Sequence, residues 1–369
     1  MIDSLHIAGF KLFRDLTLPK LGRLNLFVGE NNTGKSCLLE AIGLYAGRNP
    51  VVDILNTASL RSQEALRPWE ADGTNEEGTS LTHPVFDLFH REGLPPVGKI
   101  YPILIERIGD ANPLIVNISH YDIITDDDGI RRYVPALPGH VTVDHLELAL
   151  QVIRGDKQVA LITRKQLPLR PRLMDTERMP NDGALIVSHL PAVGFSEEKA
   201  ASLWDALIQG PGQEQVLKWM RMLDSRIEAL DYIAGRLRTR IALLKVKGES
   251  RIQLGSMGDG LRRMFHIGLA MATASKGILL IDEFENGLHW RVQRELWAAL
   301  GRAAQEFEVQ IFATTHSRDC VGGFVSASKE LNIPDSKMYR LERKGEEIYA
   351  VDTPLINVEA ALELNGEVR

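Results

Sequence analysis

Residues 254–289 read LGSMGDGLRRMFHIGLAMATASKGILLIDEFENGLH and contain the most informative pattern of the sequence. At the centre of this stretch, the apolar run Ile278–Ile281 ends on the acidic pair Asp282-Glu283. A short continuous apolar run predicts a strand buried on both faces of a parallel sheet. Because α/β sheets bind ligands at the carboxyl ends of their strands, the two carboxylates predict a functional site at this end.

The two flanks of this run are also informative. Upstream, Ser256–Gly260 places a hydroxyl and two glycines at the start of an amphipathic helix, where backbone N–H groups can face an anion. Downstream, Glu285–His289 is a polar turn that leads into a helix predicted over Trp290–Ala304. A nucleotide is a suitable anion for such a site, so a separate phosphate-binding segment is expected.

The phosphate-binding segment lies near the N-terminus, where GENNTGKS at 29–36 fits the pattern GxxxxGK[ST]. It follows the apolar strand Leu24–Val28 and opens a helix predicted over Lys35–Tyr45. The loop N–H groups can wrap phosphates, the lysine can reach the β and γ oxygens, and the serine hydroxyl can hold Mg²⁺. The alternative is a glycine-rich turn with no ligand. The candidate nucleotide-binding residues of this segment are Gly29, Glu30, Asn31, Asn32, Thr33, Gly34, Lys35, Ser36 and Cys37.

Composition narrows the class of protein. The chain has 369 residues, of which 44% are hydrophobic and 25% charged, which is typical of a globular protein. We find neither an apolar run of membrane-spanning length nor an N-terminal signal, so we expect a cytoplasmic protein without membrane insertion. The net charge of −6 excludes a global basic field, so any nucleic-acid contact must be local. Cys37 and Cys320 are expected to be buried apolar side chains.

Short strands are expected on both sides of the phosphate loop. Residues 5–26 predict two or three strands, separated by turns at Arg14-Asp15 and Gly22-Arg23. From Ile100 onward, strand signals predict an antiparallel sheet with hairpin turns at 126–129 and 154–157. Residues 71–82 predict a flexible loop, and the Arg- and Pro-rich residues 164–180 predict a connection. Three side chains before the loop could meet a base or ribose, or belong to an exposed hairpin: Lys11, Phe13 and Arg14.

The middle of the chain predicts helices and a basic segment. Residues 196–234 predict helices broken at 210–212. An apolar stripe at helical spacing favours core packing over a protruding arm; it comprises Leu217, Met220, Leu223, Ile227 and Leu230. The segment 236–251 alternates cations with apolar residues, which suits either a track for a phosphate backbone or a charged edge strand. Its cations are Arg236, Arg238, Arg240, Lys245 and Lys247.

The next predicted buried strand is Gln310–Ala313. The segment Thr314-Thr315-His316-Ser317 follows it and contains a histidine. A lone histidine is usually structural. His316, however, follows the strand that comes after the acidic one, where a γ-phosphate would lie, so we favour a functional role. Lys337–Val351 predicts a closing hairpin turned at 344–346.

Taken together, these motifs resemble the ABC-type ATPases of the SMC and RecF kind, and most of all the ATPase part of OLD (overcoming lysogenization defect) family proteins. The matching elements are the N-terminal strand pair, GENNTGKS, SMGDGLRRM, ILLIDEFENGLH and TTHS, in that order. SMGDG departs from the transporter signature LSGGQ, which speaks against a transport ATPase. OLD proteins carry a Toprim nuclease domain that we do not find after the closing hairpin, so nuclease activity is not carried over.

The resemblance implies an α/β P-loop NTPase fold of the ABC type, with a mixed sheet core, an antiparallel β subdomain and a helical subdomain. We expect one ATPase domain over 1–369. It would comprise an N-terminal lobe (1–180), a helical segment (196–235) and a C-terminal lobe (236–369).

The resemblance also implies roles for individual residues. Lys35, Glu283 and His316 would be catalytic, with Glu283 as the base that orients water and His316 as the switch histidine. Ser36 and Asp282 would hold Mg²⁺. Ser256 and Gly258 would belong to the signature that completes the ATP site of a partner protomer, and Glu285–His289 to the D-loop. No Q-loop glutamine can be placed.

These roles imply an ATPase that works as a dimerising conformational switch. The expected partners are a homodimer or higher oligomer with composite ATP sites, and a separate effector or nuclease, with DNA as a possible ligand. Genome maintenance or anti-phage defence is the expected setting. The alternative is the nucleotide-binding subunit of a membrane transporter.

Overall fold

The computed structural model describes residues 1–59, 84–90, 93–125, 131–138, 146–163, 185–235, 239–331, 335–364 and 366. A six-stranded sheet in the order β16-β15-β3-β14-β13-β9 forms its centre. All neighbouring strands are parallel except the hairpin β15–β16, so the predicted mixed sheet is confirmed. The strands are β3 (Leu24–Val28), β9 (Val187–Leu190), β13 (Ile278–Ile281), β14 (Gln310–Thr314), β15 (Ser336–Lys344) and β16 (Glu347–Asp352).

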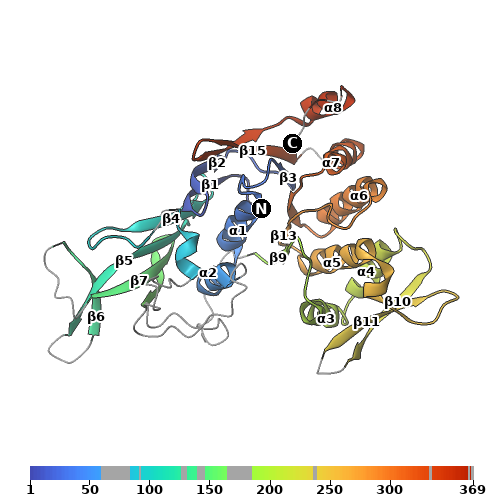
Figure 1. The fold of residues 1–369 in the computed structure, drawn as a ribbon, viewed down its shortest axis with the longest axis horizontal. Coiled ribbons are helices and arrows are strands. Elements are labelled where there is room, and N and C mark those ends of the chain that lie inside the picture. Colours follow the sequence, from blue (N-terminus) through green and yellow to red (C-terminus); the bar gives the residue numbers. More distant parts are fainter. Residues whose placement is uncertain are drawn as a thin grey trace, which may run out of the picture.

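Helices cover both faces of this sheet (Figure 1). On one face, Leu280 of β13 packs in the cluster that contains α1 (Lys35–Ala46). On the other, Leu279 and Ile281 pack with α5 (Asp259–Thr273), α6 (Trp290–Glu306) and α7 (Arg318–Glu330). Since successive side chains of a strand point to opposite faces, both faces of β13 must be apolar, which explains its continuous apolar sequence.

An antiparallel sheet extends to the left of the centre in Figure 1, in the order β2-β1-β4-β5-β7-β8 with β6 paired to β5. Its strands are β1 (Leu5–Phe10), β2 (Phe13–Leu18), β4 (Tyr101–Glu106), β5 (Leu114–Thr125), β6 (Arg131–Pro135), β7 (Leu146–Arg154) and β8 (Lys157–Thr163). Helix α2 (Pro50–Ser59) and the short 3₁₀ helix η1 (Pro84–Leu88) contact each other beside it. This confirms the antiparallel subdomain and the hairpin turn between β7 and β8.

One turn was predicted in the wrong place. Arg14 and Asp15 lie inside β2, and the chain reverses at Lys11 and Leu12 instead, where Lys11 has a positive φ of 47°. The expected turn at 126–129, loop at 71–82 and connection at 164–180 lie outside the described residues.

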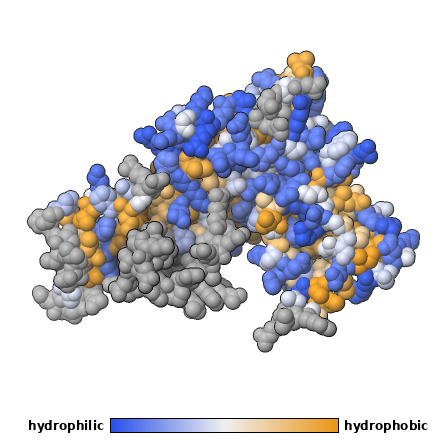
Figure 2. All heavy atoms as spheres, in the orientation of Figure 1, coloured by the Kyte–Doolittle hydropathy of each residue, from blue (hydrophilic) through white to orange (hydrophobic). Residues whose placement is uncertain are grey.

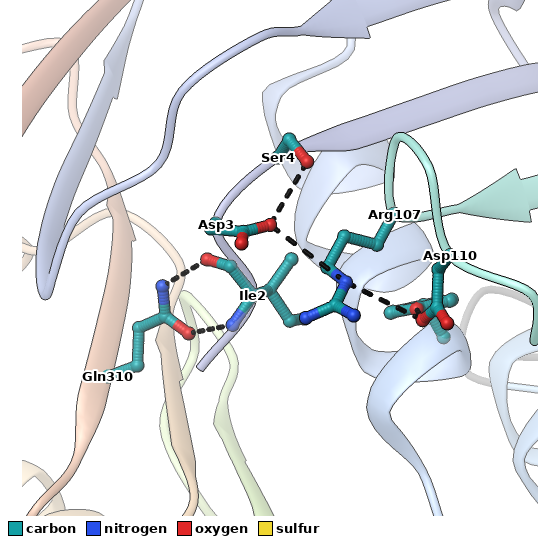
Figure 3. Close-up of polar contacts among 7 residues, drawn as sticks. Ile2, Asp3, Ser4, Arg107, Asp110 and Gln310 are labelled. Atoms are coloured by element: carbon teal, nitrogen blue, oxygen red, sulfur yellow. Dashed lines mark hydrogen bonds and ion pairs between the residues drawn. The ribbon is translucent and has the colours of Figure 1, made fainter.

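The N-terminal residues join the two sheets (Figure 3). The main chain of Ile2 exchanges two hydrogen bonds with the side-chain amide of Gln310, at 2.8 Å and 2.7 Å. Asp3 lies 3.9 Å from the guanidinium of Arg107, which in turn lies 3.5 Å from Asp110. The start of β14 and the loop after β4 are therefore held together through the chain terminus.

The helical subdomain contains less helix than expected. Helices α3 (Glu197–Ala206) and α4 (Gly212–Met220) are followed by a three-stranded sheet of β10 (Ile227–Ala234), β11 (Arg240–Val246) and β12 (Ile252–Gln253). The helix predicted to continue through Ala234 was wrong after Met220, where α4 ends. A register shift between Ile227 and Ala229 indicates a bulge, and both Ile227 and Leu230 are buried in this subdomain's core. A bulge lets residues three apart share one face, and this imitates helical spacing.

Two of the three described cations of the basic segment, Arg240 and Lys245, form ion pairs. Arg240 pairs with Asp205, and Lys245 lies 2.8 Å from Glu228. Strand β11 pairs with β10 on one side and over two residues with β12 on the other, so it is not an edge strand. Neither proposed role for this segment gains support; Arg236 and Arg238 lie outside the described residues.

The chain ends in the predicted hairpin β15–β16 and a helix, α8 (Leu355–Glu363), which contacts α7. Figure 2 shows a mainly hydrophilic surface around the centre, with hydrophobic atoms gathered toward the two outer subdomains. Among the described residues, no helix combines the length and apolar character that crossing a bilayer requires. The cytoplasmic location expected from the sequence stays a prediction.

Candidate functional site

The loop 29–36 connects β3 to α1, as predicted, and is tightly packed. Thr33 Oγ1 donates a 2.8 Å hydrogen bond to the carbonyl of Glu30 within the loop. Gly34 has φ 87°, and a Cβ there would lie 2.8 Å from two atoms of the Phe13 ring. Only glycine suits this position, because the backbone is left-handed and an aromatic ring closes the space beside it. The loop shape therefore depends on Phe13 as well as on its own sequence.

Lys35 lies inside the curve of this loop. Its ammonium donates to the carbonyls of Gly29 at 2.9 Å and Glu30 at 2.7 Å, and the side chain is buried. Burial lowers the pKa of Lys35 to about 8, although the nearby carboxylates Asp282, Glu283 and Glu285 act in the opposite direction. The structure thus brings together the lysine and the acidic stretch, which are almost 250 positions apart in the chain. A buried cation next to loop amides is suited to phosphate oxygens.

Asp282 and Glu283 follow directly after β13, and Thr314 at the end of β14 contacts both. Thr314 Oγ1 donates to Asp282 Oδ1 at 2.6 Å and accepts the N–H of Glu283 at 2.9 Å. Glu283 has a positive φ of 48°, a conformation that costs a non-glycine residue about 1–3 kcal/mol. Such strain persists where surrounding contacts impose it and is common at functional sites.

The segment after β14 is fixed by Glu285. The N–H of His316 donates to Glu285 Oε1 at 2.8 Å, and Thr315 Oγ1 donates to Oε2 at 2.7 Å. Burial lowers the pKa of His316, and the positive charge of Lys35 lowers it further. His316 therefore belongs to the same electrostatic cluster as Lys35, as its position after β14 predicted.

Ser256 and Gly258 occupy a different environment. Ser256 lies in the short 3₁₀ helix Leu254–Met257, and Gly258, with φ 93°, begins α5. Both are exposed, and a Cβ on Gly258 would meet nothing within 4 Å. The adjacent Asp259 packs against Gly287 of the polar turn after β13. The predicted signature is thus an open surface next to the predicted D-loop.

The three side chains considered for the base or ribose differ in environment. Lys11 pairs with Glu40 of α1 at 2.5 Å, and Phe13 is buried against the loop. Arg14 is 73% exposed and lies 3.7 Å from Glu347, so it alone of the three remains available to a ligand.

The residues present fit Mg²⁺ bound together with phosphates. Ser36 is the second residue of α1, and Asp282 directly follows β13 and lies close enough to Lys35 to act on its charge. Within the described part of the chain, no group of three or more His, Cys, Asp or Glu side chains could hold a metal by itself. Mg²⁺ is commonly held by one or two protein oxygens, substrate phosphates and water, so this sparse donor set is suitable.

Two residues of the site were missed from the sequence. Thr314 was included in the TTHS motif, but no role was predicted for it. Arg263 is 5% exposed, and its guanidinium donates to the carbonyls of Asp282 at 2.6 Å and Glu283 at 2.8 Å. The available signal was a cation within the buried face of α5, next to Met264 and Phe265. Cys37 and Cys320 are buried, as expected.

Comparisons with known proteins show which families the chain resembles. A family model described as an AAA ATPase domain matches residues 201–321. An "ATP/GTP phosphatase" of Helicobacter pylori is 22% identical over 339 residues, which span 87% of this chain and 86% of that protein. The DNA replication and repair protein RecF of Heliobacterium modesticaldum is 34% identical over 73 residues, 20% of each chain.

Two solved structures share the fold. An SMC head bound to the C-terminal winged-helix domain of ScpA has a TM-score of 0.50 at 13% identity, covering 97% of this chain and 99% of that one. An SMC head with an extended coiled coil, bound to the C-terminal domain of ScpA derived from Pyrococcus furiosus, has a TM-score of 0.50 at 11% identity, covering 99% of both.

The chain therefore has an SMC head-like P-loop ATPase fold, and the comparisons support an ATPase of the SMC and RecF-like type. They do not favour the transporter alternative. Membership of the OLD family is not confirmed and stays a prediction.

Proposed function

We propose that this protein binds ATP with Mg²⁺ at the 29–36 loop, hydrolyses it, and uses the cycle to open and close a dimer. One observation carries the proposal: Lys35 is buried within the loop after β3, and the carboxylates that follow β13 at the same edge of the sheet lie close enough to act on its charge. Positive charge and carboxylates gathered at one sheet edge are what phosphoryl transfer requires.

Each residue then has a defined task. The loop N–H groups and Lys35 hold the β and γ oxygens, in place of the carbonyls that Lys35 contacts in this structure. Ser36 and Asp282 hold Mg²⁺, which neutralises phosphate charge when bound. Glu283 orients a water molecule and takes its proton as the water oxygen attacks the γ-phosphorus. ADP leaves with the electron pair of the broken bond, and the phosphate product is released. His316 contacts the γ-phosphate.

The exposed signature supports the proposed dimer. Ser256 and Gly258 present an uncovered surface, while Glu283 and His316 are half-buried beside the buried Lys35. Each signature would complete the ATP site of the partner protomer, so ATP stabilises the closed dimer and hydrolysis releases it. The change in shape would act on DNA or on a separate effector or nuclease, in genome maintenance or anti-phage defence. The RecF relative supports the DNA side of this proposal.

Hydrolysis by the purified chain tests the first step. Phosphate release should require ATP and Mg²⁺, and should be abolished in Lys35→Ala, which loses the cation facing the β and γ oxygens. Isothermal titration that shows unchanged ATP affinity in folded Lys35→Ala would refute the site. GTP should be assayed in parallel, because the Helicobacter relative carries both nucleotides in its name.

Purification of the native complex tests the second step. Co-purification of DNA, or of an effector or nuclease whose association depends on ATP, would support the switch. A membrane protein as the sole stoichiometric partner would contradict it.

A further inference from the structure

Arg263 of α5 is a buried cation with an unusual set of partners. Its two terminal nitrogens donate to four backbone carbonyls, Asp282 and Glu283 after β13 and Pro191 and Ala192 after β9, at 2.6 to 3.3 Å. Within the described part of the chain, it forms no ion pair with a carboxylate. A guanidinium has five N–H donors in a fixed planar arrangement, so one arginine can hold two chain segments that end side by side.

Burial of this charge is unfavourable. Desolvation lowers the pKa of Arg263 to about 10, although Asp282, Glu285 and Glu283 attract the charge. An apolar side chain would fill the same space in the core without this cost. The arginine therefore needs a role that depends on its hydrogen bonds.

The carbonyl of Glu283 indicates that role. Glu283 is held in its left-handed conformation from both sides, since its N–H is bonded to Thr314 and its carbonyl to Arg263. The Glu283 carbonyl also accepts the N–H of Asn286 at 3.1 Å within the turn, so the Arg263 bond is the contact that ties this carbonyl to α5. Loss of the Arg263 bond would weaken the restraint on the main chain and let the carboxylate shift. Thr314 belongs to the central sheet, whereas Arg263 belongs to the helix that starts at the predicted signature.

The same helix also fixes the loop after β9. His266 Nδ1 accepts the N–H of Phe195 at 3.3 Å, one turn along from Arg263. Asn286, in the turn after β13, donates to the carbonyl of Ala192 at 2.8 Å. Helix α5, the end of β9 and the acidic stretch therefore form one connected unit.

We propose that Arg263 is a positioning residue, which sets the main-chain conformation of Glu283 and makes it follow any movement of α5. The inference rests on the proposed function. When a partner protomer engages Ser256 and Gly258, α5 carries Arg263 with it, and the carbonyl of Glu283 follows. Hydrolysis is then fastest when the dimer is closed.

Arg263→Lys tests the proposal, because lysine keeps the charge but cannot reach four carbonyls. We expect ATP affinity to change by less than about threefold, while kcat falls about 10- to 100-fold, the scale of a small misplacement at a reacting group. Its ATP-dependent dimer should still form. The matched control is Arg262→Lys, since the side chain of Arg262 is 45% exposed and its guanidinium pairs with Asp259 of the same helix. A folded Arg263→Lys with the parental kcat, or with affinity reduced in proportion to kcat, overturns the proposal.

A double-mutant comparison separates positioning from general damage. If Arg263 acts through Glu283, Arg263→Lys should cause no further loss of kcat in a Glu283→Gln background. If the kcat of the double variant falls by the product of the two single losses, the proposal is overturned.

If Arg263→Lys fails to fold, Arg263→Ala assayed with added guanidinium is the second test. The kcat of this variant should rise with guanidinium concentration and then saturate. A folded Arg263→Ala whose kcat does not rise counts against the proposal. An inactive parent protein would instead refute the proposed ATPase, so the two failures can be told apart.

Discussion

Thr314 Oγ1 donates a hydrogen bond to Asp282 Oδ1 at a distance of 2.6 Å, across the carboxyl ends of β14 and β13. The same oxygen accepts the N–H of Glu283 at 2.9 Å, and Thr314 is fully buried. One hydroxyl thus orients the proposed Mg²⁺ ligand and the proposed base together. A valine of similar shape would lose both contacts, whereas serine could keep them.

Thr314→Val should therefore reduce ATPase activity by at least about tenfold and raise the Mg²⁺ concentration needed for half-maximal rate. It also leaves the part-buried N–H of Glu283 without this partner, which should lower the free energy of unfolding. Thr314→Ser is the control and should retain most of the rate. Steady-state assays over a Mg²⁺ titration measure both effects. Parental rates and Mg²⁺ dependence in the valine variant would show that this hydroxyl has no part in the reaction.

The nucleotide loop and the acidic strand could be predicted from the sequence because their patterns allow few alternatives. Ile278–Ile281 is apolar at every position, so only a strand buried on both faces suits it, and β13 has these bounds. Gly29–Ser36 likewise fixes a loop between a strand and a helix. In both cases, local sequence and tertiary environment require the same structure.

The remainder depended on contacts that no local pattern reveals. The spacing of Ile227 and Leu230 suited a helix, but a bulge in β10 buries both. Strand β9 has only four residues and gains its place by pairing with β13. In the sequence, Arg263 is one of two adjacent arginines. In the structure it is buried where the chain segments after β9 and β13 lie side by side, whereas Arg262 is exposed.

ATP affinity should depend on pH through Lys35. Burial lowers its pKa to about 8 from an ordinary 10.5, so the nucleotide-free protein loses this cation as pH rises above about 8. Phosphate oxygens favour the charged form, and binding should therefore take up a proton in the range above pH 8. We expect the Kd for ATP to rise by up to about tenfold per pH unit there.

Isothermal titration in buffers of different ionisation enthalpy measures this proton uptake directly. The same pKa shift predicts that nucleotide-free protein gains stability between about pH 8 and 10.5, where the unfolded chain binds more protons at this group. Lys35→Ala is the control for the stability gain and should lack this contribution. An ATP affinity that stays constant from pH 7 to 9.5 would contradict a shifted lysine at the phosphates.

Glu283→Gln should keep ATP binding and lose hydrolysis. The amide retains the size of the side chain and leaves the backbone contacts with Thr314 and Arg263 available, but it cannot take a proton from water. Hydrolysis should fall by roughly two or more orders of magnitude. ATP-bound dimers should persist, as seen by light scattering over time. Hydrolysis at the parental rate would place the base at another residue.

Ser256→Arg tests whether the ATP sites are composite. Ser256 is exposed at the start of the α5 region, and Gly258 beside it has open space around it, so an arginine here is tolerated by the fold of one protomer. In a composite site, the same arginine would clash with the partner's nucleotide region and block the ATP-induced dimer. ATP binding by the monomer should be unchanged. Ser250→Arg, which also adds an arginine at an exposed loop serine, is the matched control and should dimerise normally.

Mixing Ser256→Arg with Lys35→Ala tests the arrangement further. In a mixed dimer, one site combines both lesions, and the other is built from the intact Lys35 of one protomer and the intact Ser256 of its partner. Recovery of ATPase activity on mixing would therefore support sites shared between protomers, provided that one occupied site suffices to close the dimer. The decisive measurement is the size of Ser256→Arg alone with ATP. Dimers as abundant as those of the parent would refute a composite site, because a signature that faces a partner's phosphate cannot accept a bulky cation without weakening the association.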